Sequence, residues 1–362
     1  MTNSLIVING YDFSNDKCCG IHRNAMEIAA CIDVLLGECG HNVKVEAAVP
    51  AGCDAPLYEN IRPVVLDCGK KSKLDKLKWR EVVYPQYIKK VDAIGLDMTL
   101  GLPKRGRFCV FDYDCIVEDH AEVYYYYYAS LRRIHYMRRV RNSLKRAQVV
   151  FTDSNYAKAR IQEHYGCPDE KMVVVPCAWQ HMQRFVQDDG VLEKFGLEDK
   201  IFFFALGSRY PYKNFRWVEC AARQNPQYQF VVTGSEIGSG DKDGTDKPSN
   251  LLFTGYLSDG EIKGLMAHCK AFLQPSFEEG FGIPPLEAMS VGADCIVSAA
   301  ASLPEVYGDS VRYIDPSDYD HIDLDAILAK PVSGTKQKVL DRYSWMKSAE
   351  IVLGTIERQC FV

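Results

Sequence analysis

The stretch EEGFGIPPLEAM, residues 278–289, has the composition of a turn between a buried strand and a helix. Residues 271–276, AFLQPS, lie shortly before it and predict a short buried strand, and residues 286–289 predict a helix that begins after a proline in its first turn. In open α/β sheets, ligands bind where the strands end and the helices begin. The two carboxylates that flank the turn, Glu279 and Glu287, therefore fall at a predicted ligand-binding edge.

The residue types in this turn suit a nucleotide bearing a sugar on its diphosphate. Gly280 and Gly282 lack a Cβ and let backbone amides approach a ligand, and free N–H groups at a helix start attract phosphate without a metal. Glu287 in the first helical turn can accept two hydrogen bonds from a vicinal diol such as ribose. Glu279 is then expected to face the transferred sugar. Either glutamate alone would indicate only an ordinary loop or helix-start carboxylate, but the combination with glycines and prolines favours the ligand site.

Strand and helix patterns alternate along the whole chain, which predicts parallel sheets covered on both faces. At about 150 residues per domain, the 362 residues predict two Rossmann-like domains, 1–182 and 183–345, with a hinge in the polar stretch Gln180–Lys200. The predicted strands are 5–9, 42–47, 63–66, 107–112, 148–152 and 172–176 in the first domain, and 201–206, 229–233, 251–254, 271–274, 294–298 and 311–314 in the second.

Composition is that of an ordinary enzyme of the cytosol. With 47% hydrophobic residues the chain can bury two cores, and a formal net charge of −5 argues against a general nucleic-acid binder. No apolar run approaches the roughly 18 residues that span a bilayer, and residues 1–8 lack the features of a signal peptide. The 14 cysteines are scattered and contain no C-x-x-C pair, so neither a disulfide framework nor a zinc site is predicted.

Two cations accompany the carboxylates. Arg209 and Lys213 follow the predicted strand 201–206 and precede a helix that starts near Asn214. A departing diphosphate carries extra negative charge, which either a metal or Arg and Lys side chains can stabilise. We therefore expect both cations to point toward the same strand-end edge as Glu279, rather than to be solvated loop residues.

These segments together resemble the retaining GT-B glycosyltransferases, especially glycosyltransferase family four. The stretch 278–289 resembles the E-x7-E signature of that family. The similarity extends to segments on either side of the signature: GSRYPYKNF (207–215) resembles its basic loop, FTGYLSD (253–259) its base-side loop, SLPEV (302–306) the segment after the signature, and YSW (343–345) the segment before the final helix. From about residue 200 onward the match is nearly continuous, and before that it is scattered.

The resemblance implies a GT-B fold in which two Rossmann-like domains face each other across a cleft, with the helix 346–362 crossing back to the first domain. It implies transfer with retained configuration and no metal cofactor, from a UDP or GDP sugar to a glycan or lipid-linked hydroxyl in surface polysaccharide assembly. The implied donor-site residues are Gly20, Arg209, Lys213, Gly255, Tyr256, Glu279, Gly280, Phe281, Gly282, Ile283 and Glu287. Among them Gly255 and Tyr256 would line the nucleobase pocket.

The first half offers one competing motif. Asp112-Tyr113-Asp114 matches D-x-D, the metal-binding signature of the GT-A class, in which two carboxylates hold a hard cation. By resemblance, Tyr113-Asp114 instead corresponds to a His-Asp pair of the family, and Asp114 becomes a further catalytic candidate near the sugar or the acceptor. A GT-A-like transferase, a GT-B-fold epimerase or phosphorylase, and a binding-only relative remain alternatives.

An unusual segment runs from Tyr124 to Arg146, with five consecutive tyrosines followed by seven Arg and Lys residues on one predicted helix. Such a helix suits an anionic membrane surface near a lipid-linked acceptor. A solvated helix whose tyrosines pack beneath the sheet explains the same pattern. Peripheral contact with the inner face of the membrane is therefore one of two open interpretations.

Overall fold

The computed structural model describes residues 4–13, 20–38, 40–53, 57–69, 72–99, 105–120, 130–207, 210–234 and 247–361, with residues 130–132 described by their backbone alone. The chain divides into two compact units. Unit 1 comprises Met1–Glu118, Tyr128–Cys177 and Trp345–Val362, and unit 2 comprises Asp119–Tyr127 and Ala178–Ser344. The stretch Gln180–Lys200, predicted to be a hinge, is therefore part of unit 2, where its short helix packs on a neighbouring helix.

Unit 1 is built on a seven-stranded sheet in the order β3-β2-β1-β4-β5-β6-β7, and every strand pair described is parallel. Its central strands are continuous apolar runs buried on both faces, as parallel sheets require. The strands are β1 (Leu5–Asn9), β2 (Lys44–Pro50), β3 (Arg62–Leu66), β4 (Ile94–Asp97), β5 (Phe108–Phe111), β6 (Val149–Thr152) and β7 (Met172–Val174).

Strand β4 was missed by the sequence prediction because it is short and holds Gly95, which usually weakens a strand. In the structure this glycine makes room for a side chain of the neighbouring strand. A Cβ at Gly95 would lie 2.2 Å from Cδ1 of Phe108, its partner in the β4–β5 register. The glycine is thus a packing requirement of the sheet rather than a break in it.

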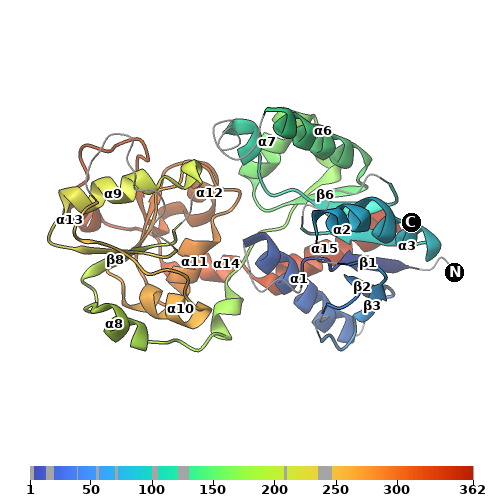
Figure 1. The fold of residues 1–362 in the computed structure, drawn as a ribbon, viewed down its shortest axis with the longest axis horizontal. Helices are drawn as coiled ribbons and strands as arrows, with labels where there is room; N and C mark the ends of the chain where they lie inside the picture. Colours follow the sequence, from blue (N-terminus) through green and yellow to red (C-terminus); the bar gives the residue numbers. More distant parts are fainter. Residues whose placement is uncertain are drawn as a thin grey trace. The chain divides into compact units, whose positions relative to one another are not determined.

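Helices cover this sheet on both faces (Figure 1). The last helix of the chain belongs to unit 1 and packs against the first. The helices of unit 1 are α1 (Gly20–Gly37), α2 (Lys73–Lys78), the π-helical turn η1 (Trp79–Val83), α3 (Tyr84–Lys90), α4 (Ile116–Asp119), α6 (Ser130–Arg146), α7 (Asn155–Tyr165), the 3-10 turn η2 (Asp169–Lys171) and α15 (Trp345–Cys360). The run Tyr124–Tyr128 lies outside the described residues, and no helix of the described part is long and apolar enough to cross a membrane.

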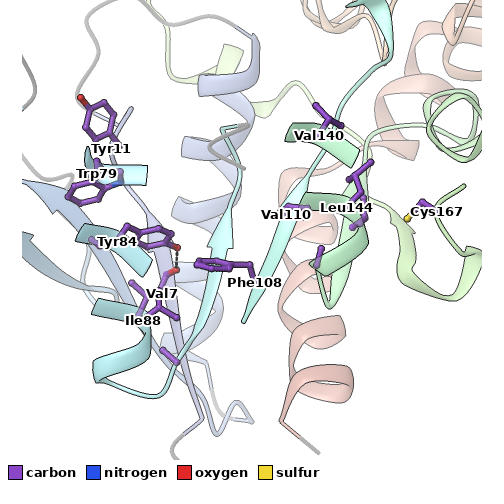
Figure 2. Packing of buried hydrophobic residues seen from close by; sticks show 14 of the residues in the cluster. Val7, Tyr11, Trp79, Tyr84, Ile88, Phe108, Val110, Val140, Leu144 and Cys167 are labelled. Atoms are coloured by element: carbon purple, nitrogen blue, oxygen red, sulfur yellow. Dashed lines mark hydrogen bonds between the residues drawn. The ribbon is translucent and has the colours of Figure 1, made fainter. Parts of the chain in front are cut away.

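An aromatic column fills one side of this core (Figure 2). Trp79 stacks on Tyr84 with ring centroids 6.1 Å apart, and Phe108 lies beyond Tyr84 at 5.7 Å. The buried hydroxyl of Tyr84 donates a 2.7 Å hydrogen bond to the carbonyl of Val7. Because a buried hydroxyl is costly without a partner, this bond fixes α3 against β1.

Unit 2 contains a six-stranded parallel sheet in the order β10-β9-β8-β11-β12-β13. The chain runs outward in one direction through β8, β9 and β10 and then in the other through β11, β12 and β13, so the order reverses between β8 and β11. This is the strand order of a dinucleotide-binding fold, whose ligand crevice lies at the reversal. The strands are β8 (Phe202–Ala205), β9 (Gln229–Val232), β10 (Leu251–Phe253), β11 (Ala271–Gln274), β12 (Cys295–Ser298) and β13 (Arg312–Ile314).

The helices of unit 2 enclose an apolar core centred on Phe203, Trp217 and Phe230. They are η3 (Gln180–Gln183), α8 (Gly190–Phe195), η4 (Pro211–Lys213), α9 (Phe215–Gln224), α10 (Asp259–His268), α11 (Ile283–Ser290), α12 (Leu303–Tyr307), η5 (Gly308–Ser310), α13 (Leu324–Ala329) and α14 (Lys336–Arg342). The prediction of two doubly wound α/β units is confirmed, and all six strands predicted for the second half are present within two residues at each end.

Candidate functional site

Two of the predicted site residues of unit 2 lie in the loops at the strand reversal between β8 and β11. Lys213 ends η4 in the loop after β8, and Glu279 lies in the loop after β11. A small hollow that opens to solvent lies at the ends of these two strands. Its lining comprises Ala205, Leu206, Lys213, Phe215, Val218, Leu273, Gln274, Pro275 and Ser276. The hollow thus occupies the position at which this strand order binds ligands.

Lys213 and Glu279 form an ion pair at this edge. The Lys213 Nζ donates to both carboxylate oxygens of Glu279, at 2.7 and 2.9 Å, and the Gln274 Nε2 donates to Oε1. The Glu279 side chain is 9% exposed and that of Lys213 is 25% exposed. A buried carboxylate held by a cation is far better placed to act electrostatically than a solvated one, because local screening is weak. The structure therefore brings these two predicted residues together.

The neighbour of Lys213, Asn214, holds the loop in place. It adopts a left-handed conformation at φ 54° and is 3% exposed. Its Nδ2 donates to the carbonyls of Pro275 and Pro316 at 2.9 and 2.8 Å, and Tyr319 OH donates to its Oδ1 at 3.0 Å. The sequence pattern marks Asn214 only as the start of a helix. Asparagine is also, after glycine, among the residues that most readily adopt this left-handed conformation. One side chain thus joins the loops that follow β8, β11 and β13.

The glycine turn before α11 has the geometry that its sequence predicted. Gly282 caps the helix at φ 82°, a conformation that favours glycine, and Ile283 is the first helical residue. Ser302 Oγ donates to the carbonyl of Glu279 at 2.9 Å, and the buried hydroxyl of Tyr307 donates to the carbonyl of Gly282. These two bonds to carbonyls hold the turn in place at the start of α11.

Phe281, predicted as a donor-site residue, has its side chain buried in unit 2. The ring is 3% exposed and packs edge-on against Tyr343, with centroids 5.1 Å apart. Any contact of this residue with a ligand would therefore use its backbone, as for Gly280. The buried ring anchors the turn to the segment that precedes α15.

The prediction that Glu287 lies in the first helical turn is wrong, because α11 begins at Ile283 and Glu287 is its fifth residue, with its side chain 13% exposed. Its Oε1 lies 2.7 Å from Nε2 of His181, whose side chain is fully buried. An ionised carboxylate only accepts hydrogen bonds, so the imidazole N–H is the donor. His181 was not among the predicted site residues. The pair is 106 residues apart in sequence, and no local motif marks it.

The predicted nucleobase side is formed by a glycine bridge and an exposed ring. Gly234 and Gly255 exchange backbone hydrogen bonds of 2.7 and 3.0 Å just beyond β9 and β10, and Gly255 has φ 74°. Tyr256, the next residue, is 85% exposed. An exposed ring at a strand end offers a surface on which a base can stack.

Three other predicted residues lie elsewhere. Arg209 is outside the described residues. Gly20 begins α1 and Asp114 follows β5, so both belong to unit 1. Asp114 Oδ1 accepts a 3.1 Å hydrogen bond from the Ile116 amide, and Tyr113 turns its hydroxyl to the carbonyl of Met98 at 2.7 Å in the core. Tyr113 is therefore a packing residue of unit 1.

The D-x-D motif does not present two open carboxylates. Asp112 is 2% exposed, and burial together with the charges of Glu118 and Asp114 raises the pKa of its carboxyl well above the usual range. A carboxyl that favours its neutral form is a poor ligand for a divalent cation. Within the described ranges, no three His, Cys, Asp or Glu side chains are grouped as metal ligands would be.

Both halves of the chain match glycosyltransferase families. Residues 191–331 match Glycosyl transferases group 1, and residues 41–179 match Glycosyltransferase Family 4. The O-antigen chain mannosyltransferase B of Escherichia coli is 30% identical over 205 residues, covering 52% of this chain and 54% of that protein. The O-antigen chain mannosyltransferase RfbU of Salmonella typhimurium is 26% identical over 204 residues, covering 54% of each. The matches thus span about half the length of these curated relatives.

The fold is shared with solved structures over nearly the entire chain. Sucrose-phosphate synthase from Thermosynechococcus elongatus superimposes with a TM-score of 0.72 and 16% identity, covering 99% of both chains. At this identity the similarity concerns the fold alone, which is the GT-B architecture of two parallel-sheet domains. The alternative of a GT-A-like fold is therefore wrong.

Proposed function

Because the chain belongs to the GT-B glycosyltransferases of family four, we propose that it transfers a hexose from a nucleotide-diphosphate sugar to a hydroxyl of a glycan or lipid-linked acceptor. The observation that carries this proposal is the Lys213–Glu279 pair at the strand reversal of unit 2. The activity is proposed to retain the configuration of the sugar and to need no metal.

The reaction places charge where these residues can stabilise it. The bond between the sugar C1 and the diphosphate oxygen breaks, the acceptor oxygen bonds to C1, and the acceptor proton passes to the departing phosphate. Lys213, with Arg209 as a further candidate, stabilises the diphosphate as its negative charge increases. Glu279 and the amides of Gly280–Gly282 orient the sugar, and Glu287 holds the ribose. Asp114 remains a candidate for a contact near the acceptor.

The relatives favour mannose as the transferred sugar. Two of them are named O-antigen chain mannosyltransferases, which supports a role in surface polysaccharide assembly. Ribose recognition by Glu287 suits UDP and GDP equally, since both carry ribose. A deoxyribose donor such as a dTDP sugar lacks the 2′-hydroxyl and suits the site less well.

Contact with a membrane surface is a further part of the proposal. Arg138, Arg141, Lys145 and Arg146 are exposed on α6 and carry the charge that attracts anionic lipids. Sedimentation with vesicles containing phosphatidylglycerol is expected to carry the protein down at low salt. Equal sedimentation with neutral phosphatidylcholine vesicles would contradict this part.

A thermal-shift panel of nucleotide sugars tests the proposed function. GDP-mannose, or a UDP hexose if the base differs, is expected to raise the melting temperature, because a ligand that binds only the folded state stabilises it by mass action. Free mannose and the corresponding dTDP sugar serve as controls and are expected to have little effect. A panel in which no nucleotide sugar raises the melting temperature would overturn the proposal.

The expected absence of a metal requirement separates this proposal from a metal-dependent one. Turnover of the stabilising nucleotide sugar should be unchanged in excess EDTA, because Lys213 and the helix-start amides supply the positive charge that a cation would otherwise provide. Loss of activity with EDTA and its recovery with Mg²⁺ or Mn²⁺ would show a metal-dependent transferase. Conversion of the sugar nucleotide without a hydroxyl acceptor would instead indicate an epimerase or phosphorylase.

A further inference from the structure

The buried pair formed by His181 and Glu287 has a geometry that fixes one oxygen of the carboxylate and leaves the other accessible. Oε1 of Glu287 accepts from Nε2 of His181 at 2.7 Å. Within the described part of the chain, Oε2 of Glu287 accepts no hydrogen bond from the protein, and the side chain is 13% exposed. The carboxylate is therefore oriented by the protein through one oxygen and can accept from a ligand hydroxyl through the other.

His181 is itself rigidly held. Its ring packs edge-on against Phe185, with centroids 6.0 Å apart, and the side chain is fully buried. The 3-10 turn η3 that carries it is tied to two other parts of unit 2. Lys263 Nζ donates to the carbonyls of Met182 and Phe185 at 2.7 and 2.8 Å, and Gln180 Nε2 donates to the carbonyl of Tyr343 at 2.9 Å.

We propose that His181 is a positioning residue that fixes Glu287 for recognition of a ribose hydroxyl and so sets the preference for ribonucleotides over 2′-deoxyribonucleotides. This inference rests on the proposed function. A glutamate side chain has three rotatable bonds, and a carboxylate free to rotate accepts from a ligand hydroxyl only after it has been ordered. The His181 N–H supplies that order before the ligand arrives, which is the basis of preorganised recognition.

The test compares the affinity of the full chain for GDP and 2′-deoxy-GDP, and for UDP and 2′-deoxy-UDP, by calorimetry. The wild type is expected to prefer the ribonucleotide of the base it binds by about 10-fold or more, the scale of one hydrogen bond to a charged group. His181→Phe keeps a ring of similar size but removes the donor, and is expected to bring this ratio close to one. His321→Phe, at an exposed histidine of the same unit, is the matched control and should keep the wild-type ratio.

Two further variants separate positioning from simple structural support. His181→Gln offers an amide N–H to Glu287 and should restore most of the ribonucleotide preference. In a Glu287→Gln background, His181→Phe should change the ratio no further, because a residue that acts through another loses its effect when that partner is changed. If His181→Phe folds poorly, His181→Leu removes the same donor from the buried site, and the same loss of the ribonucleotide preference is expected.

The outcomes distinguish this inference from the proposed function. If the wild type binds neither nucleoside diphosphate, the proposed function and the inference about His181 are both contradicted. If it binds one but without a ribonucleotide preference, or if His181→Phe weakens both nucleotides equally and keeps the ratio, the proposed function stands and the role of His181 is contradicted.

Discussion

Replacing Lys213 with alanine is expected to lower turnover of the nucleotide sugar at least about 100-fold, the scale of one lost oxyanion-type contact. The ammonium group is held 2.7 Å from Glu279, and the Lys213 side chain is 25% exposed, so the protein orients this side chain without burying it fully. Its removal takes away the cation that would stabilise the departing diphosphate. Among the described residues, it also leaves Gln274 as the side-chain partner of the buried Glu279 carboxylate.

A second Lys–Glu pair in the same unit provides a matched control. Lys194 Nζ on α8 lies 2.6 Å from Glu261 Oε1 on α10, with the lysine side chain 53% exposed and the glutamate side chain 15% exposed. Lys194→Ala removes the same charge and the same number of atoms, but from a lysine that is about twice as exposed and lies away from the strand reversal, and ion pairs of exposed lysines contribute little. It should leave turnover within about twofold. Near-native activity in Lys213→Ala, or an equal loss in Lys194→Ala, would contradict the assignment of Lys213.

Replacing Asn214 with alanine is expected to lower the free energy of unfolding of unit 2 by about 2–4 kcal/mol. The substitution leaves the carbonyls of Pro275 and Pro316 without their donor and places alanine in a left-handed conformation. The same loop carries Lys213, so the substitution should also displace its ammonium group from the diphosphate of the donor. The folded protein should therefore turn over the donor about 10- to 100-fold more slowly. Denaturant unfolding and kinetics of the folded protein measure the two effects.

Asn225 provides the control for this prediction. It is also buried, and its Nδ2 donates to the carbonyls of Ala221 and Ile322 at 2.8 and 2.7 Å, but it lies at the far end of α9 from Lys213. Asn225→Ala should lower stability by a similar amount while the folded protein keeps its turnover. Equal kinetic losses in the two variants would mean that Asn214 acts on stability alone.

Local pattern was sufficient to predict the sheets and the glycine turn. The turn before α11 was predictable because Gly282, two prolines and the preceding apolar strand each favour the same local geometry. Strand β4 was not predictable from local pattern, because the reason for a glycine at position 95 is the ring of Phe108, which lies in the adjacent strand. A glycine that weakens an isolated strand is required in this one by its neighbour.

The candidate site also contains features that local sequence predicts and features that depend on the packed fold. Lys213 and Glu279 were predicted separately from their positions at strand ends, and the strand order then explains why they meet. The bonds of Asn214 and the pairing of His181 with Glu287 join residues that are 61 to 106 positions apart. Contacts of that range depend on the packed fold and leave no periodic or spacing signal in the sequence. An asparagine directly after a lysine at the end of a strand, as at Asn214, was a local sign that the loop could be held by a side-chain amide.

The central claim is that the strand reversal of unit 2 binds the diphosphate and ribose of a sugar nucleotide. A crystal structure with GDP or UDP, whichever stabilises the protein, tests it most directly. The account predicts the diphosphate within hydrogen-bond distance of Lys213 Nζ and the amides of the Gly280–Gly282 turn, with a ribose hydroxyl on Oε2 of Glu287. A nucleotide bound away from the loops after β8 and β11, or one whose ribose makes no contact with Glu287, would contradict it.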